Sequence, residues 1–185
     1  MMFDSPPPTP RPPHPLALAL LELVGARFGA RVLEVGAGSG RNTRVLTGAG
    51  LEVVGLESGL EAVAALATHA LLHGTPQSIA SALDSIARLL QPGAPFFGTF
   101  GSVRDARYGT GVEIEPHVYA PATGDEAGVA HTYFDEPRLR AMMAADWEIE
   151  SLREVAVDAI AGTWAHPQTP LRGAVHWFLI ATKRR

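Results

Sequence analysis

The chain of 185 residues contains no cysteine. Disulfide bonds, thiolate metal sites and a cysteine nucleophile are therefore excluded. Lysine is almost absent too, because Lys183 is the only one and the remaining basic residues are arginine. The formal net charge of −4 gives no electrostatic basis for binding a nucleic acid, so no nucleic-acid partner is expected.

The sequence also lacks a long apolar run and the pattern of a secretory leader. Its longest apolar run, 16–21, ends at Glu22 and is far too short to span a membrane. The N-terminus is rich in proline, whereas a signal peptide is basic and then apolar. We therefore expect a cytoplasmic protein with no membrane partner.

A helix or strand pattern is missing from residues 4–15. Proline dominates this stretch, and it has no amide hydrogen to donate and a fixed φ. The composition predicts a disordered or polyproline-like tail over 1–15. The rest of the chain, 16–185, is long enough to form one domain with its own core.

The stretch 31–43 organises the remaining sequence. An apolar run of strand type over 31–35 leads into glycines at three alternate positions, and a helix is expected over 41–47. Glycine allows a positive φ and the close approach of a ligand, and the start of a helix offers unpaired N–H groups. The pattern predicts a nucleotide-type cradle at the carboxyl end of a first parallel strand. Its glycines are Gly36, Gly38 and Gly40.

The spacing of these glycines indicates which nucleotide is expected. A dinucleotide fingerprint, G-x-G-x-x-G, needs glycine where this chain has Arg41. The pattern is instead acidic-x-G-x-G-x-G, and its acid is Glu34. This pattern is similar to the first motif of class I S-adenosylmethionine (SAM) methyltransferases. The competing interpretation is a glycine-rich turn that binds no ligand.

The resemblance implies a set of SAM-binding residues. In the family the glycine loop passes under the methionine part of SAM, and an acid at the end of the second strand holds the ribose hydroxyls. Glu57, which closes the expected second strand 51–56, matches that acid. A carboxylate suits a ribose because it accepts hydrogen bonds from two hydroxyls at once. The cofactor-binding residues implied are Glu34, Gly36, Gly38, Gly40 and Glu57.

The interval after Glu57 departs from the family. A helix, a third strand and an acidic loop normally precede the fourth strand there, but in this chain 60–73 follows almost at once. Either the helix and third strand have been lost, since such a unit needs about thirty residues, or 60–73 is a helix and the fourth strand is missing. Alanine and leucine favour a helix by propensity. The family resemblance favours a strand in at least 63–68.

The second half of the chain completes the expected fold. Thr75 and Pro76 begin an amphipathic helix, a buried strand is expected over 96–100, and 101–134 has little periodicity. A helix over 137–144 and two strands over 147–157 and 174–182 follow. The fold class predicted is α/β, a Rossmann-like and mainly parallel sheet that has a C-terminal antiparallel hairpin and lacks the third strand.

Histidines provide the other chemical candidates. His69 and His73 are four apart, a metal-binding spacing on a helix, but no H-E-x-x-H pattern or third ligand accompanies them, so no metal site is expected. The resemblance places His73 just beyond the fourth strand, where SAM and acceptor meet. It is the candidate catalytic general base, and the alternative is a histidine that only satisfies nearby backbone groups.

The segment 101–134 is the candidate acceptor side. It is interpreted as a lid that selects the substrate, or else as a solvated loop. Its polar and aromatic residues are Asp105, Arg107, His117, Tyr119, Asp125, Glu126, His131 and Tyr133.

Taken with the resemblance, these features imply SAM-dependent methyl transfer to a small-molecule acceptor. A degenerate relative, without catalysis and acting as a structural or interaction module, is the alternative, supported by the short interval after Glu57. A nicotinamide-dependent oxidoreductase is a second rival, which Arg41 disfavours.

Overall fold

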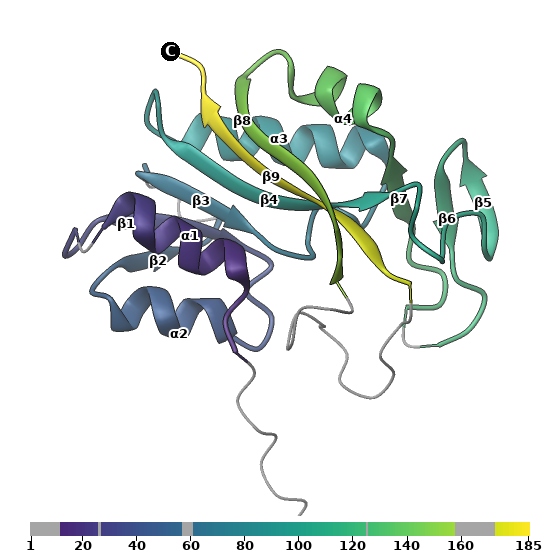
Figure 1. Ribbon diagram of the computed structural model, residues 1–185, viewed down its shortest axis with the longest axis horizontal. Coiled ribbons are helices and arrows are strands. Elements are labelled where there is room, and N and C mark those ends of the chain that lie inside the picture. The colour runs from purple at the N-terminus through teal and green to yellow at the C-terminus, as the bar shows by residue number, and fades with distance from the viewer. Residues whose placement is uncertain (1–11, 26, 57–60, 125, 158–172) are drawn as a thin grey trace, which may run out of the picture.

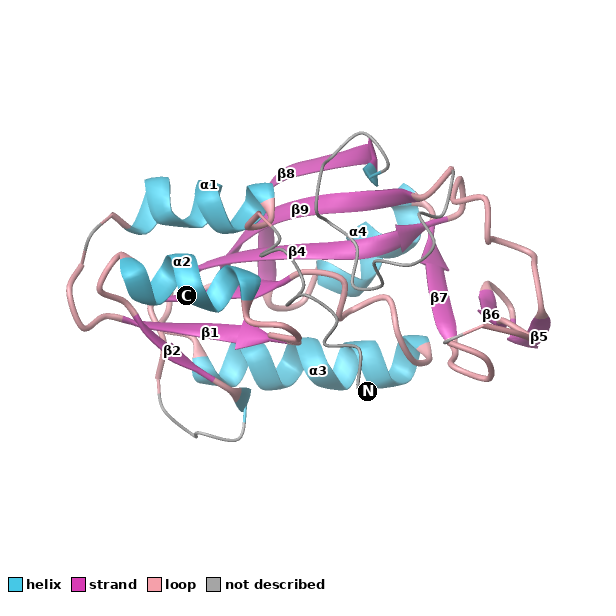
Figure 2. Cartoon of the chain, turned by 90° about the horizontal axis from the view of Figure 1, so that it is seen from below, coloured by secondary structure: helices cyan, strands magenta, loops and turns pink. Residues whose placement is uncertain are grey.

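The computed structural model describes residues 12–25, 27–56, 61–124, 126–157 and 173–185. Helices cover both faces of one twisted sheet (Figures 1 and 2). The helices are α1 (Pro15–Val24), α2 (Arg41–Gly48), α3 (Pro76–Leu89) and α4 (Glu136–Met143). The strands are β1 (Arg31–Val35), β2 (Glu52–Val54), β3 (Ala64–Ala67), β4 (Pro95–Ser102), β5 (Val112–Glu115), β6 (Val118–Ala120), β7 (His131–Phe134), β8 (Trp147–Ala156) and β9 (Val175–Lys183).

The sheet has a parallel half and an antiparallel half. Strands β2, β1, β3 and β4 are neighbours in that order and run parallel. Strand β9 then pairs antiparallel with β4, and β8 pairs antiparallel with β9. This arrangement confirms the predicted fold class, a Rossmann-like, mainly parallel core closed by a C-terminal hairpin.

Side chains alternate between two apolar cores. On β1, Val32 packs with α1 and α2, whereas Leu33 packs with α3 and α4. On β4, Phe97 joins the first core and Phe96 the second. Because both faces are covered, these strands bury apolar side chains on both sides, as is usual for parallel sheets.

Strand β3 decides between the two interpretations of 60–73. Ala64–Ala67 is a fully buried strand between β1 and β4, so the helical alternative was wrong. Alanine has a high helix propensity, but burial on both faces of a sheet outweighs it. In the described part of the chain, β2 is the edge of the sheet, and no strand follows β2 before β3 in the sequence. Residues 57–60 lie outside the described residues.

The segment 101–134 is more ordered than its composition predicted. Strands β5 and β6 form a hairpin, β6 pairs with β7, and β7 runs parallel to the last two residues of β4. The hairpin lies at the end of the molecule away from α1 and α2 (Figure 1). All four residues of β5 are exposed, so the alternation of its apolar and acidic residues does not mark a buried face.

The first helix begins at Pro15 and ends at Val24. His14 caps it, because its Nδ1 accepts a hydrogen bond from the Leu16 amide at 3.1 Å. A search of the described helices for one long and apolar enough to cross a membrane found none.

Candidate functional site

The glycine loop leaves β1 at the carboxyl edge of the sheet. Gly36 has a φ of 73°, and a Cβ there would lie 2.7 Å from the Cβ of Ala70, so only glycine fits. Gly38 has a φ of 52°, and its nearest neighbour would be the Gly36 oxygen at 3.9 Å. Helix α2 begins directly behind, and its N-cap residue Gly40 supplies no side-chain cap. The loop is packed against the protein at Gly36 and open at Gly38.

Glu34 lies under this loop with one carboxylate oxygen unsatisfied. The side chain is buried, and its Oε2 accepts a hydrogen bond from Thr43 Oγ1 at 2.5 Å. Its Oε1 is also buried but has no hydrogen-bond partner within the described part of the chain. A buried acceptor without a donor is uncommon and costs free energy unless a ligand completes it. Glu57, the predicted ribose ligand, lies outside the described residues.

Three buried or half-buried histidines, which we call the inner histidines, gather beside the start of α2. They are His14 on the N-cap of α1, His69 just after β3, and His176 on β9. The ring centroids of His14 and His69 lie 5.3 Å apart, and those of His69 and His176 lie 5.0 Å apart. His69 has a φ of 56°, a conformation that non-glycine residues seldom adopt.

Asn42 fixes this cluster to the glycine loop. Its Oδ1 accepts a hydrogen bond from the His14 amide at 2.9 Å, and its Nδ2 donates to Thr68 Oγ1 at 3.0 Å. The adjacent His69 amide donates to Thr99 Oγ1 at 2.7 Å. Asn42 therefore joins the starts of α1 and α2 to the end of β3.

The inner histidines are held neutral. Burial is the main cause, and it lowers the pKa of His14 to about 3 and that of His176 to about 4. Burial also lowers the pKa of His69 well below its ordinary value. Nearby guanidinium groups act in the same direction, Arg41 on His14 and Arg107 on His176.

A carboxylate does approach His176, but an arginine neutralises it. Asp105 Oδ2 lies 3.9 Å from His176 Nε2, while both Asp105 oxygens bond to the Arg107 guanidinium at 2.8 and 2.9 Å. Burial would raise the pKa of Asp105, but the bonds from Arg107 and from the Val175 amide lower it overall. The Asp105 oxygens are therefore already occupied.

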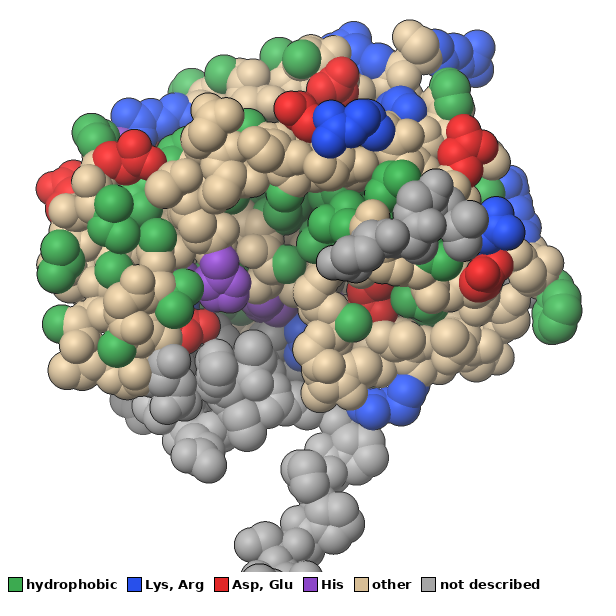
Figure 3. Space-filling view, turned by 180° about the vertical axis from the view of Figure 1, so that it is seen from behind, with side chains coloured by type: hydrophobic (Ala, Val, Ile, Leu, Met, Phe, Trp, Pro, Cys, Tyr) green, Lys and Arg blue, Asp and Glu red, His purple; other side chains and the backbone are tan. Residues whose placement is uncertain are grey.

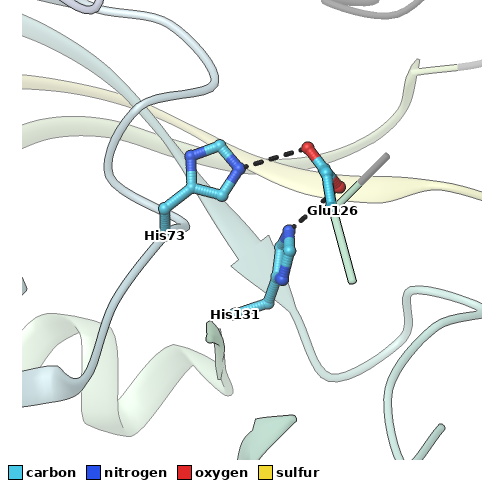
Figure 4. A group of neighbouring side chains, drawn as sticks. All are labelled: His73, Glu126 and His131. Atoms are coloured by element: carbon cyan, nitrogen blue, oxygen red, sulfur yellow. Dashed lines mark hydrogen bonds and ion pairs between the residues drawn. The ribbon is translucent and has the colours of Figure 1, made fainter. Parts of the chain in front are cut away.

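A second group, which we call the rim cluster, lies beyond β3 and consists of His73, Glu126 and His131 (Figure 4). His73 Nε2 lies 3.4 Å from Glu126 Oε1, and His131 Nε2 lies 3.1 Å from Glu126 Oε2. The two imidazoles approach the carboxylate from different segments, so each faces its own oxygen. His131 is buried, whereas the side chain of His73 is 36% exposed.

Backbone hydrogen bonds hold the rim cluster in place. The Gly74 amide donates to the Ala130 carbonyl at 2.7 Å, and the Thr132 amide donates to the Leu72 carbonyl at 2.9 Å. These bonds make His73 and His131 an antiparallel cross-strand pair. The His73 amide also bonds to the carbonyl of Ala70, the residue that packs on Gly36.

Aromatic side chains continue from the rim cluster toward the hairpin. Tyr108 stacks on His117, with its hydroxyl 2.8 Å from His117 Nδ1, and contacts Tyr119 and Tyr133 edge to face. Burial raises the pKa of Tyr133 to about 12, so its hydroxyl stays protonated. A hollow of about 460 Å³ borders His117 and Tyr133. On the face seen from behind, histidine side chains reach the surface beside an acidic group (Figure 3).

The predicted site residues thus fall into separate places. Glu34 and the three glycines lie together at the carboxyl end of β1, and His73 lies on the rim beyond β3. His69 and His73 do not lie on one helix, since the first joins the inner histidines and the second the rim cluster. Sequence reasoning passed over four buried polar residues of the inner side, and no spacing marked them. These are His14, Asn42, Thr68 and His176.

Comparison with known proteins places the fold but not the function. No family model and no curated protein matches the chain. Among solved structures, a SAM-dependent methyltransferase from Methanosarcina mazei has a TM-score of 0.70 at 16% identity, covering 94% of this chain and 99% of that one. An N1-methyltransferase from Burkholderia thailandensis, bound to S-adenosylhomocysteine and 1,6-didemethyltoxoflavin, has a TM-score of 0.65 at 20% identity, covering 93% and 78%.

A [4+2]-cyclase has the same fold. Its TM-score is 0.59 at 18% identity, and the alignment covers 91% of this chain and 80% of that one. The chain therefore has the fold of class I SAM-dependent methyltransferases, and this fold carries more than one reaction.

Proposed function

We propose that this chain binds SAM in the glycine loop and transfers its methyl group to a small-molecule acceptor. The observation that carries the proposal is the unsatisfied, buried Oε1 of Glu34 directly beneath a loop that is open at Gly38. The two methyltransferases among the structural neighbours support the choice of ligand, since one contains S-adenosylhomocysteine and a small heterocyclic acceptor.

The described residues fit SAM in charge and in shape. SAM carries a sulfonium and an ammonium group, and Glu34 offers a buried acceptor to a cationic donor. Gly38 allows the backbone to approach the ligand, and the uncapped start of α2 follows at Gly40. Glu57 is proposed as the partner of the ribose hydroxyls.

When bound, SAM supplies a methyl group already activated by the sulfonium, so the protein needs no catalytic triad. Its residues hold the cofactor and the acceptor in line, which accounts for much of the rate in such reactions. The inner histidines contribute a polar wall without charge, because burial keeps them unprotonated near neutral pH. A neutral wall neither repels the sulfonium nor competes with Glu34 for the ammonium group.

The acceptor side is assigned to the rim cluster and the segment 101–134. The general-base role of His73 stays a prediction, and its Nε2 already faces Glu126 Oε1 at 3.4 Å. The role of 101–134 as a lid also stays a prediction. It would be supported by protection from limited proteolysis when SAM and an accepted substrate are both present, and contradicted by unchanged cleavage under turnover.

Calorimetry with SAM, S-adenosylhomocysteine and NAD tests the proposal. Replacing Glu57 by alanine removes charge-assisted hydrogen bonds and is expected to cost about 2 kcal/mol of SAM binding, roughly thirtyfold in Kd. Glu34→Gln should also weaken SAM binding. The matched control is Glu52→Gln, which removes an exposed carboxylate paired with Arg31. Binding of NAD in place of SAM would favour the oxidoreductase, and binding of neither would favour the non-catalytic module.

A further inference from the structure

The rim cluster contains a conflict of hydrogen-bonding groups. His131 Nδ1 lies 2.8 Å from the Val129 carbonyl oxygen, which only accepts, so Nδ1 carries the proton. In the neutral ring Nε2 then has a lone pair, and that lone pair faces the lone pairs of Glu126 Oε2 at 3.1 Å. Two acceptors at this distance repel each other unless a proton or a metal cation lies between them.

The geometry matches the ligand shell of a tetrahedral metal ion. Ligand atoms about 2.0–2.1 Å from a zinc ion lie roughly 3.3 Å apart at tetrahedral angles. The two contacts of Glu126 in the rim cluster are 3.4 and 3.1 Å, and the three offered ligand atoms all lie within 4.8 Å of one another. Small movements of the carboxylate would bring all three within reach of one ion.

The surroundings of His131 are those of a metal ligand. A ligating histidine usually donates its second N–H to a carbonyl or carboxylate, which orients the ring, and Val129 supplies that carbonyl here. The cross-strand backbone bonds at Gly74 and Thr132 fix the two histidines before any ion arrives. Exposure of His73 provides the entry path.

We propose that His73 Nε2, His131 Nε2 and the Glu126 carboxylate bind one divalent transition-metal ion of the zinc class. Two imidazoles and one carboxylate favour such an ion over Mg²⁺ or Ca²⁺, which prefer all-oxygen shells. Three protein ligands leave one position open. In this arrangement His73 is a ligand and not the general base.

The open position would take an oxygen atom of the acceptor, and this part of the inference rests on the proposed function. A bound cation lowers the pKa of a coordinated hydroxyl, so its proton leaves to water and the oxygen remains nucleophilic. That oxygen forms the new bond to the methyl carbon while the bond from carbon to sulfur breaks and the electron pair stays on sulfur. Atoms and charge balance with S-adenosylhomocysteine and the methylated acceptor as products.

The metal site is tested on the full chain after dialysis against a chelator. ZnCl₂ is titrated by calorimetry, and CoCl₂ by the visible absorption of the bound ion. One equivalent is expected to bind, and millimolar MgCl₂ should not compete. Glu126→Gln keeps the shape of the side chain and removes its charge, and it is expected to weaken Zn²⁺ by about a hundredfold. Glu113→Gln, which removes an exposed carboxylate on β5, is the matched control and should stay within twofold.

His73→Ala removes the most exposed of the three ligands, so it is the substitution least expected to disturb folding. It should weaken Zn²⁺ binding as Glu126→Gln does. Absence of Zn²⁺ binding, or binding unchanged in both variants, would overturn the proposal and leave a hydrogen-bonded ion pair with a protonated histidine. SAM calorimetry on the metal-free chain separates the two proposals, because the glycine loop does not need the ion. Loss of SAM binding with Zn²⁺ binding retained would contradict the proposed function alone.

Discussion

The inner histidines are buried and lie near arginine side chains, whereas the histidines of the rim cluster share a carboxylate. Arg41 and Arg107 lower the pKa of the inner rings further, and Asp105, a carboxylate near His176, is already bound to Arg107. In the rim cluster, the neighbouring imidazoles of His131 and then of His73 hold the pKa of Glu126 well below its usual range. Burial therefore keeps histidines neutral in one place, whereas histidines share a carboxylate in the other.

The position of each cluster suits a different part of the reaction. The inner histidines join the glycine loop through Asn42, where a cationic cofactor is proposed. Thr132 and Tyr133, which follow His131 in β7, line the exposed hollow, where an acceptor is proposed. The inner imidazoles are thus uncharged beside the proposed cofactor site, and a carboxylate is present where a metal ion would act as a Lewis acid.

The largest expected effect is a loss of stability in mild acid, because the inner histidines are held neutral by the fold. The folded pKa values of His14 and His176, about 3 and about 4, lie below the ordinary value of 6.5. The unfolded chain therefore binds protons first as the pH falls, and stability is lost as the pH falls through 6.5. The slope approaches about 1.4 kcal/mol per pH unit for each histidine, so the loss is roughly 3 kcal/mol for both between pH 6.5 and 5.

Urea unfolding at pH 7.5, 6.5 and 5 measures this loss in the metal-free chain. The matched variant is His14→Asn, because asparagine is a good N-cap and does not titrate. It should recover about 2 kcal/mol of the loss at pH 5. Equal acid sensitivity in this variant and the unaltered chain would show that His14 is not held neutral by the fold.

A metal ion should stabilise the chain through the rim cluster and not through the inner histidines. Zn²⁺ at a hundred times its Kd is expected to raise the free energy of unfolding by about 2.7 kcal/mol through binding to the rim cluster alone. The stabilisation should vanish in Glu126→Gln and persist in His14→Asn. If instead His14→Asn removed the effect, the ion would bind the inner histidines, and our distinction between the clusters would be wrong.

Removing the Asn42 side chain should lower stability around the inner histidines and leave the rim cluster unchanged. Asn42→Ala leaves the His14 amide and Thr68 Oγ1 without their partner in a buried position, which is expected to cost about 2 kcal/mol of stability. The control on the same helix is Thr47→Ala, whose exposed hydroxyl bonds only to the carbonyls of its own helix, and it should stay within about 0.5 kcal/mol. Zn²⁺ affinity should be unchanged in both, and a loss in Asn42→Ala would mean that the clusters are coupled.

The features that could be predicted from the sequence are those that depend on a short stretch of residues. The glycine loop and the start of α3 were predicted because their signals are local: Thr75 does accept a hydrogen bond from the Ser78 amide, and Pro76 is the first helical residue. Strand β3 stayed ambiguous, since alanine and leucine suit a helix and only burial between two strands decides otherwise.

The clusters could not be predicted because they depend on distant pairs. Glu126 lies 53 residues after His73 in the chain, and only the pairing of 72–74 with 130–132 brings them together. His14 was counted with the proline-rich tail, whose composition conceals a helix cap. Glu34 could be named as a candidate cofactor residue because its motif is contiguous, whereas His14, whose amide bonds to Asn42, has no such motif.

The smallest effect is expected from removing the Thr132 hydroxyl, which bonds to the backbone next to the rim cluster. Thr132 Oγ1 donates to the Gly74 carbonyl at 2.6 Å, one residue from each of the two rim histidines. Thr132→Val keeps the volume but leaves that buried carbonyl without its side-chain donor, which should cost about 1 kcal/mol of unfolding free energy. Because a ligand set works best when its orientation is fixed in advance, Zn²⁺ affinity should also fall several-fold, far less than in Glu126→Gln. Thr110→Val is the control, since its hydroxyl bonds to the Arg107 carbonyl at an exposed turn. Stability and affinity measured together separate the outcomes: a loss of stability with unchanged Zn²⁺ affinity would mean that Thr132 supports the strand pairing without positioning the metal ligands.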